Sequence, residues 1–109
     1  MKPTRYTAEM IGEYVQKGIW DTMTFAQVWD RNALLFPDRE AIVDSRTRLT
    51  WAGAKKRIDR IALGLMELGM EKDQVVVVQL PNCVELILLY VACEKAGVSP
   101  FNVYEAVVV

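Results

Sequence analysis

Apolar residues recur at helical spacing in two stretches near the N-terminus of this 109-residue chain. The first stretch spans residues 7–17, and Gly18 follows it as a candidate C-terminal cap. The second begins after Thr24, which suits an N-cap, and ends before Pro37, which cannot continue a helix. We predict two helices, whose inner faces carry Met10, Ile11, Tyr14 and Val15 in the first and Phe25, Val28, Trp29, Ala33 and Leu34 in the second.

A third helix is predicted by the clearest periodic segment, which Gly69 closes as its cap. Its apolar positions form one stripe: Ile58, Ile61, Ala62, Leu65 and Leu68. A basic cluster shares this helix: Lys55, Lys56, Arg57 and Arg60. Because Asp59 and Glu67 interrupt the cluster, we interpret it as a solvated helix face rather than a nucleic-acid site.

Short β-prone runs predict the strands. Ala41–Val43 and Leu49–Trp51 flank the polar stretch 44–47, which favours a hairpin. The four valines Val75–Val78 do not alternate with polar residues, which is typical of a parallel strand covered on both faces. A further strand is predicted over Val98–Val103.

Between these last two strands lies a segment that is apolar almost all round. It predicts a deeply buried helix from about Val84 to Lys95, which Asn82 or Cys83 begins and Ala96-Gly97 ends. Strand, helix and strand in this order indicate a right-handed βαβ unit. The predicted fold class is α/β, a partial doubly wound βαβ layer with a small added β-hairpin and N-terminal helices. We expect one unit over 1–109, with a helical lead-in over 1–19 and the α/β part over 20–109.

Composition narrows the function classes. Hydrophobic residues make up 52% and charged residues 25%, which is typical of a globular chain with a core. The formal net charge of -1 gives no overall positive field that would attract nucleic acid. The chain has no histidine, which excludes Ser-His-Asp and Cys-His catalysis. No apolar run reaches the roughly 20 residues of a membrane span, and no export signal is present, so we expect a cytoplasmic protein.

No candidate catalytic, cofactor-binding or metal-binding residue emerges from the remaining motifs. The six glycines are isolated, so no phosphate-binding loop is predicted. Asn82 follows the valine strand, where open sheets bind ligands, but we interpret it as a helix cap. Two cysteines on one helix, Cys83 and Cys93, are too far apart to pair and are expected to be buried thiols. Surface positions are expected for Asp38, Glu40 and Asp44, and core packing rather than an aromatic cage for Trp20, Trp29 and Trp51.

The order of several short motifs resembles the N-terminal region of the AMP-dependent synthetase and ligase superfamily, which includes acyl-CoA synthetases, aryl-acid adenylating enzymes and firefly luciferase. The likeness covers about residues 20–100, although the loop Glu71-Lys72-Asp73 lacks the family's usual glycine. The matching motifs are Trp20 with Thr24-Phe25, Ala33 with Pro37–Val43, Leu49-Thr50-Trp51, Leu68-Gly69, Asp73 before the valines, Leu80-Pro81-Asn82 with Glu85, and Ala96-Gly97.

This resemblance implies a parent enzyme that uses ATP, magnesium and CoA to convert a carboxylic acid to an acyl-adenylate and then a thioester. The family's phosphate loop and its catalytic lysine belong to later motifs that are absent from these 109 residues. We therefore expect a fragment that is inactive alone, with the remainder of the parent enzyme as its partner. Two alternatives remain. The first is a self-associating or partner-binding module, which the β-prone stretch Glu105–Val109 favours. The second is an unrelated receiver-like domain, but this chain lacks the acidic cluster that such a domain needs after its first strand.

Overall fold

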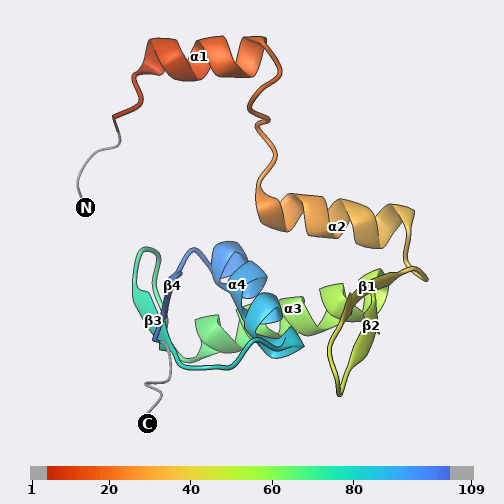
Figure 1. The fold of residues 1–109 in the computed structure, drawn as a ribbon. Helices are drawn as coiled ribbons and strands as arrows, with labels where there is room; N and C mark the ends of the chain where they lie inside the picture. The colour runs from red at the N-terminus through yellow and green to blue at the C-terminus, as the bar shows by residue number, and fades with distance from the viewer. Residues whose placement is uncertain (1–4, 104–109) are drawn as a thin grey trace, which may run out of the picture.

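The computed structural model describes residues 5–103 as four helices and four short strands. Figure 1 shows α1 standing apart at one end, with α2 lying against the α3–α4 pair and the β1–β2 hairpin at the opposite end from β3 and β4. The elements, in chain order, are α1 (Ala8–Gln16), α2 (Phe25–Leu35), β1 (Glu40–Val43), β2 (Arg48–Thr50), α3 (Trp51–Glu67), β3 (Val75–Val78), α4 (Val84–Ala96) and β4 (Ser99–Asn102).

Threonine side chains start three of the helices. The hydroxyl oxygens of Thr7, Thr24 and Thr50 each accept a hydrogen bond from the backbone N–H three residues later, at 3.1–3.2 Å. Thr24 also donates its backbone N–H to the Gln27 side chain, which completes a capping box and confirms the predicted start of α2. Because Thr50 caps α3, Trp51 is the first residue of that helix, and its assignment to the preceding strand was wrong.

Two separate two-stranded sheets are formed. β1 and β2 pair antiparallel, which confirms the hairpin, while β3 and β4 pair parallel with Val75 opposite Ser99 and Val78 opposite Asn102. The helix α4 connects the two parallel strands, and Val78 and Val98 are buried beside it. The α/β class is therefore confirmed. The predicted strand over Val98–Val103 is confirmed as the shorter β4.

The core lies where α3 packs on α4. Both helices contribute small residues at the contact, Ala54 from α3 and Ala92 from α4, which are completely buried and let the two backbones approach closely. Larger side chains fill the space around them: Ile58, Val84, Leu88 and Val91, each exposed by 1%. Six residues of α4 are buried, which confirms the prediction of a deeply buried helix.

Burial of the valine strand differs from the prediction. Val75 and Val77 are exposed by 59% and 67%, whereas Val78 is buried, so the strand is covered on one face only. The reason is architectural, because the described residues supply α4 for one face of the β3–β4 sheet and no element for the other. An apolar run indicates that a strand can be buried on both faces, but burial of the second face requires another helix or sheet that packs against it.

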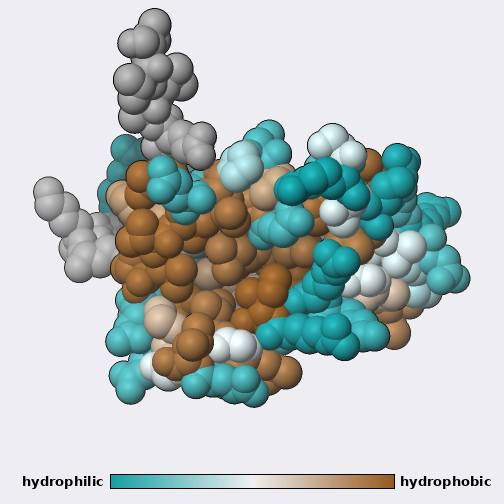
Figure 2. Space-filling view, turned by 90° about the horizontal axis from the view of Figure 1, so that it is seen from below, coloured by the Kyte–Doolittle hydropathy of each residue, from teal (hydrophilic) through white to brown (hydrophobic). Residues whose placement is uncertain are grey.

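Five positions of the predicted inner faces are exposed instead: Ile11 and Val15 of α1, Phe25 and Leu34 of α2, and Leu68 after α3. The buried residues of α2 are Ala26 and Ala33. Figure 2 shows the molecule from below relative to Figure 1. On this side apolar residues gather on the half nearer the β3–β4 sheet, and hydrophilic residues lie mainly nearer the hairpin. Helix α1 buries no residue. The β-prone stretch Glu105–Val109 lies outside the described residues.

Candidate functional site

The carboxyl edge of the β3–β4 sheet is where an open α/β sheet would hold a ligand. Leu80-Pro81-Asn82 follows β3 at this edge and is exposed. At the end of β4 the side-chain amide of Asn102 donates a hydrogen bond to the hydroxyl of Tyr90 on α4, and the Val103 N–H donates to Val78 O at 2.8 Å. Asn102 and Tyr90 therefore place an amide and a hydroxyl group at this edge, and both are used in a hydrogen bond to each other.

Helix α4 begins after its N-cap Cys83, one of the two predicted starts, but its side-chain cap is not the predicted one. Cys83 occupies the N-cap position without a side-chain hydrogen bond, so the interpretation of Asn82 as the cap was wrong. The cap comes from the hairpin instead, because Asp44 Oδ2 accepts the Val84 N–H at 2.9 Å across 40 residues of sequence. Ile42, Val43, Cys83 and Ile87 line a hollow of ≈ 420 Å³ around this contact.

Asp44 also organises the turn that carries it. Its Oδ1 accepts the N–H of Arg46 at 2.8 Å and the N–H of Thr47 at 2.7 Å, which forms an Asx turn. The hydrogen bond from Val84, followed by that from Arg46, holds the pKa of Asp44 below its ordinary value of 3.8. Asp44 was interpreted as a surface residue, and its role is to join the hairpin to α4.

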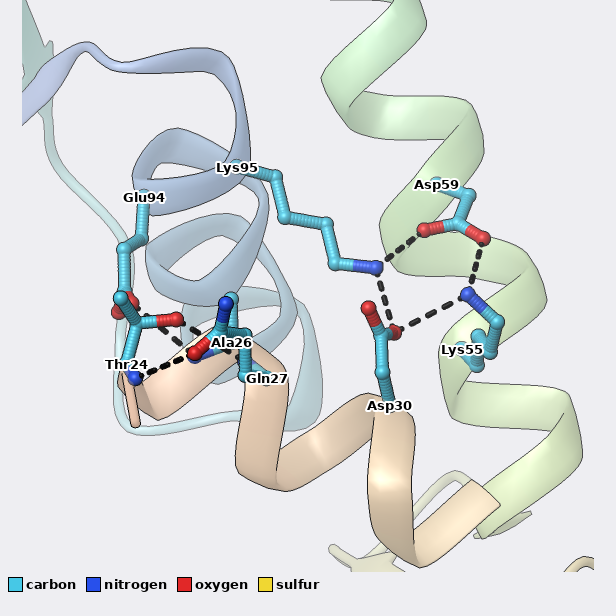
Figure 3. A network of polar contacts seen from close by, with 8 residues as sticks. All are labelled: Thr24, Ala26, Gln27, Asp30, Lys55, Asp59, Glu94 and Lys95. Carbon is cyan, nitrogen blue, oxygen red and sulfur yellow. Dashed lines mark hydrogen bonds and ion pairs between the residues drawn. The ribbon is translucent and has the colours of Figure 1, made fainter. Parts of the chain in front are cut away.

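Four alternating charges link α2, α3 and α4 (Figure 3). Lys95 Nζ lies 2.6 Å from Asp30 Oδ1 and 2.6 Å from Asp59 Oδ1. Lys55 Nζ contacts the same two carboxylates at 3.0 and 2.9 Å. Lys55 therefore belongs to an ion-pair network rather than to a solvated basic face, whereas Lys56, Arg57 and Arg60 are exposed as predicted.

The three tryptophans occupy two places. Trp29 and Trp51 meet edge to face with their ring centroids 5.0 Å apart, and Trp29 packs against the core. Trp20 instead contacts Tyr6 and Tyr14 beside α1, so its predicted place in the core was wrong. No single aromatic cage is formed by the three rings.

The thiols follow the prediction in part. Cys93 is buried and Cys83 half-buried, and both are free. Burial raises the pKa of the Cys93 thiol, which keeps it protonated and unreactive.

Chemistry at these places is limited by their residue types. Within residues 5–103, no group of three histidine, cysteine, aspartate or glutamate residues is placed to hold a metal ion. In the same range, no helix is long and apolar enough to cross a membrane. The three glycines with positive φ follow separate helices and form no loop around a phosphate. These residues do not fit a site for ATP or magnesium, so we derive no catalytic step from them.

Comparison with known proteins places these features in one family. The family model described as AMP-binding enzyme matches residues 20–107. A salicylyl-CoA synthase / salicylate adenylyltransferase of Streptomyces sp is 33% identical over 84% of this chain, and a 2,3-dihydroxybenzoate-AMP ligase of Bacillus subtilis (strain 168) is 32% identical over 89%. The apo structure of Mycobacterium smegmatis MbtA superposes with a TM-score of 0.83 at 32% identity over 89% of the chain.

The shared region is a small part of each relative. The chain spans 17% of the length of the salicylate enzyme, 18% of the dihydroxybenzoate ligase and 18% of MbtA. The matched segment contains the α2–α4 body, both sheets and the Asp44 cap described above. The chain belongs to the family of AMP-binding, adenylate-forming enzymes and matches the N-terminal region of such enzymes.

Proposed function

We propose that this chain is the N-terminal scaffold segment of an enzyme that joins a carboxylic acid to AMP, and that it does not catalyse this step alone. The observation that carries the proposal is the combination of family membership with coverage of only 17% of a relative's length. Adenylyl transfer depends on positioned phosphate-binding groups and a metal ion, and residues 5–103 contain neither a glycine-rich loop nor a group of three histidine, cysteine, aspartate or glutamate residues placed to hold a metal. ATP, magnesium and CoA would act in the complete enzyme.

The outer face of the β3–β4 sheet supports a packing role for the segment. Val75 and Val77 on β3 and Phe101 on β4 are exposed, and Val77 lies directly opposite Phe101 in the parallel register. A parallel sheet is stable when both of its faces are covered. We propose that the remaining part of the adenylate-forming polypeptide covers this face in the complete enzyme.

The substrate class that we propose is a hydroxybenzoic acid. The two curated relatives described above are named for salicylate and 2,3-dihydroxybenzoate. The alignment with the dihydroxybenzoate ligase covers 97 residues, which exceeds the number from Trp20 to the end of the chain. It therefore extends into the region of α1, so the helical lead-in is shared with an enzyme of this class.

A chimeric enzyme tests the proposal. The 97 matched residues of the Bacillus subtilis ligase are replaced by this chain, and ATP–pyrophosphate exchange is measured with 2,3-dihydroxybenzoate, salicylate and decanoate. We expect exchange with the aryl acids for the chimera, and none for the ligase without its N-terminal segment or for this chain alone. Exchange catalysed by the isolated chain would contradict the scaffold role, and so would a folded chimera that binds the acid but is inactive.

Self-association is the second candidate function, and the same exposed valines favour it. Two copies that cover each other's β3–β4 face would remove Val75, Val77 and Phe101 from water. Size-exclusion chromatography with light scattering at several concentrations separates the candidates. A monomer at all concentrations contradicts self-association and leaves the scaffold proposal in place.

A further inference from the structure

Helix α2 is attached to the rest of the molecule by an interface with few large apolar side chains. Its two buried residues are alanines, Ala26 and Ala33, and Trp29 is the large side chain that packs against the core. Phe25 and Leu34, the other large apolar residues of the predicted inner face, are exposed by 62% and 81%. Alanines bury little area, so apolar packing gives only a weak preference for one position of α2 along α3 and α4.

Polar contacts supply the missing specificity. Lys95 on α4 is exposed by only 17% and lies between Asp30 of α2 and Asp59 of α3, at 2.6 Å from each carboxylate. Lys55 of α3 closes the set from the other side (Figure 3). Each aspartate thus contacts two ammonium groups and each lysine contacts two carboxylates, a pattern that a shift of α2 by one residue would break.

A second contact fixes the N-terminal end of α2. Glu94, which precedes Lys95 on α4, accepts the Ala26 N–H with Oε1 at 3.0 Å. This carboxylate satisfies one of the backbone N–H groups that a helix start leaves unpaired. Consecutive residues of α4 therefore hold α2 at its first turn and at its middle. The remaining charged group at this contact is Lys56, which lines the hollow beside Asp30 and Asp59.

We propose that Asp30, Lys55, Asp59 and Lys95 form a polar clamp that sets the position of α2, and that α2 detaches from the α3–α4 pair as a unit when the clamp is opened. The device is independent of the family's chemistry, because it concerns how the N-terminal helices stay on the α/β body. The clamp opens when one of its charges is lost, either by substitution or by protonation of the two carboxylates. It also opens when salt screens the attraction between the charges.

The clamp is closed at neutral pH. Burial raises the pKa of Asp30 and Asp59, but the hydrogen bonds from Lys95 and Lys55 together outweigh it, so both carboxyls have a pKa below the ordinary value of 3.8. A lowered pKa in the folded state stabilises the docked helix above about pH 3.8. This stabilisation disappears as the pH falls through the lowered values.

Hydrogen exchange measured by mass spectrometry tests the clamp on the full chain. Lys95→Met keeps the aliphatic stem and removes the charge. We expect the amides of 25–35 to exchange about fivefold faster, the range that partly exposed ion pairs give, while the amides of 86–93 remain unchanged. The matched control is Lys17→Met, which removes a more exposed pair with Glu13 on α1 and is expected to change neither region.

Two further measurements keep the test decisive if Lys95→Met does not fold. Asp30→Asn removes the charge that α2 contributes to the clamp and is expected to accelerate the same amides. For the unsubstituted chain, salt at about 1 M, where the screening length is about 3 Å, should also accelerate 25–35 selectively. Unchanged exchange of 25–35, or equal acceleration of 25–35 and 86–93, overturns the proposal.

Discussion

Gly97 ends α4 and turns the chain into β4, and we predict that Gly97→Ala destabilises the protein. Gly97 has φ 74° and ψ 20°, the left-handed conformation. Its N–H donates to Glu94 O at 3.2 Å, and its carbonyl accepts the Asp73 N–H at 2.8 Å, which ties the loop before β3 to the end of α4. The position therefore controls where both parallel strands begin.

The magnitude follows from three contributions. A side chain in the left-handed region costs roughly 1–2 kcal/mol. The added Cβ would lie 3.4 Å from Lys72 Cγ, a contact that a flexible lysine relieves by a small shift. Alanine restricts the unfolded chain, which stabilises the folded state by about 0.4–1 kcal/mol. The net expectation is a loss of about 1 kcal/mol in the free energy of unfolding, or about a fivefold larger unfolded fraction.

Two other glycines serve as matched controls. Gly69 has φ 83° and no atom within 4 Å of an added Cβ, so Gly69→Ala should show the backbone cost without any contact. Gly64 lies inside α3, also with nothing within 4 Å. Gly64→Ala should stabilise the protein by about 0.5–1 kcal/mol, because glycine is the poorer helix former.

Urea unfolding followed by tryptophan fluorescence measures all three variants, because Trp29 and Trp51 lie beside the core. The expected order of stability is Gly64→Ala, the unsubstituted chain, then Gly69→Ala and Gly97→Ala. A Gly97→Ala variant as stable as the unsubstituted chain refutes the reasoning. So does a Gly64→Ala variant that is less stable than the unsubstituted chain.

Three other predictions concern single contacts. Asp44→Ala should lower the thermal midpoint of unfolding, whereas Asn82→Ala should not, because Asp44 caps α4. The difference between the two variants should disappear as the pH falls through the lowered pKa of Asp44, below 3.8. Calorimetry at several pH values checks both points. Leu88→Ala should reduce the free energy of unfolding by about 2–5 kcal/mol in urea titrations, since Leu88 is exposed by 1%. Val77→Lys with Phe101→Lys should lower the binding of a hydrophobic dye in fluorescence titrations without loss of helical circular dichroism, because both side chains are exposed on the sheet face; an unchanged dye signal contradicts this.

Local signals predicted the helices and strands well. The threonine at position 24, the apolar stripe around Ile58 and the glycine after α3 each act on residues within one or two turns, and the structure has them in these roles. The family motifs were predictive for a related reason, since Ala96-Gly97 and Leu80-Pro81-Asn82 mark the ends of α4 and β3. Short-range physics therefore determined most element boundaries.

Long-range polar partners were not predictable from periodicity. Asp44 caps a helix 40 residues away, and Lys95 pairs with Asp30 across 65 residues. Each of these residues is unremarkable in its own segment, because charged side chains in turns and at helix ends are common on protein surfaces. The exposure of Val75 and Val77 was not predicted, because an apolar run favours burial but does not show whether another element is present to cover it.

The contact between Glu94 and the start of α2 has a consequence for synthesis on the ribosome. The carboxylate that pairs with the Ala26 N–H is translated 68 residues later, a delay of roughly 3–14 s at typical elongation rates. During that time the first turn of α2 depends on its own capping box of Thr24 and Gln27. Helix α2 of the nascent chain therefore gains this contact only after α4 has been synthesised, so its final position is set late in translation.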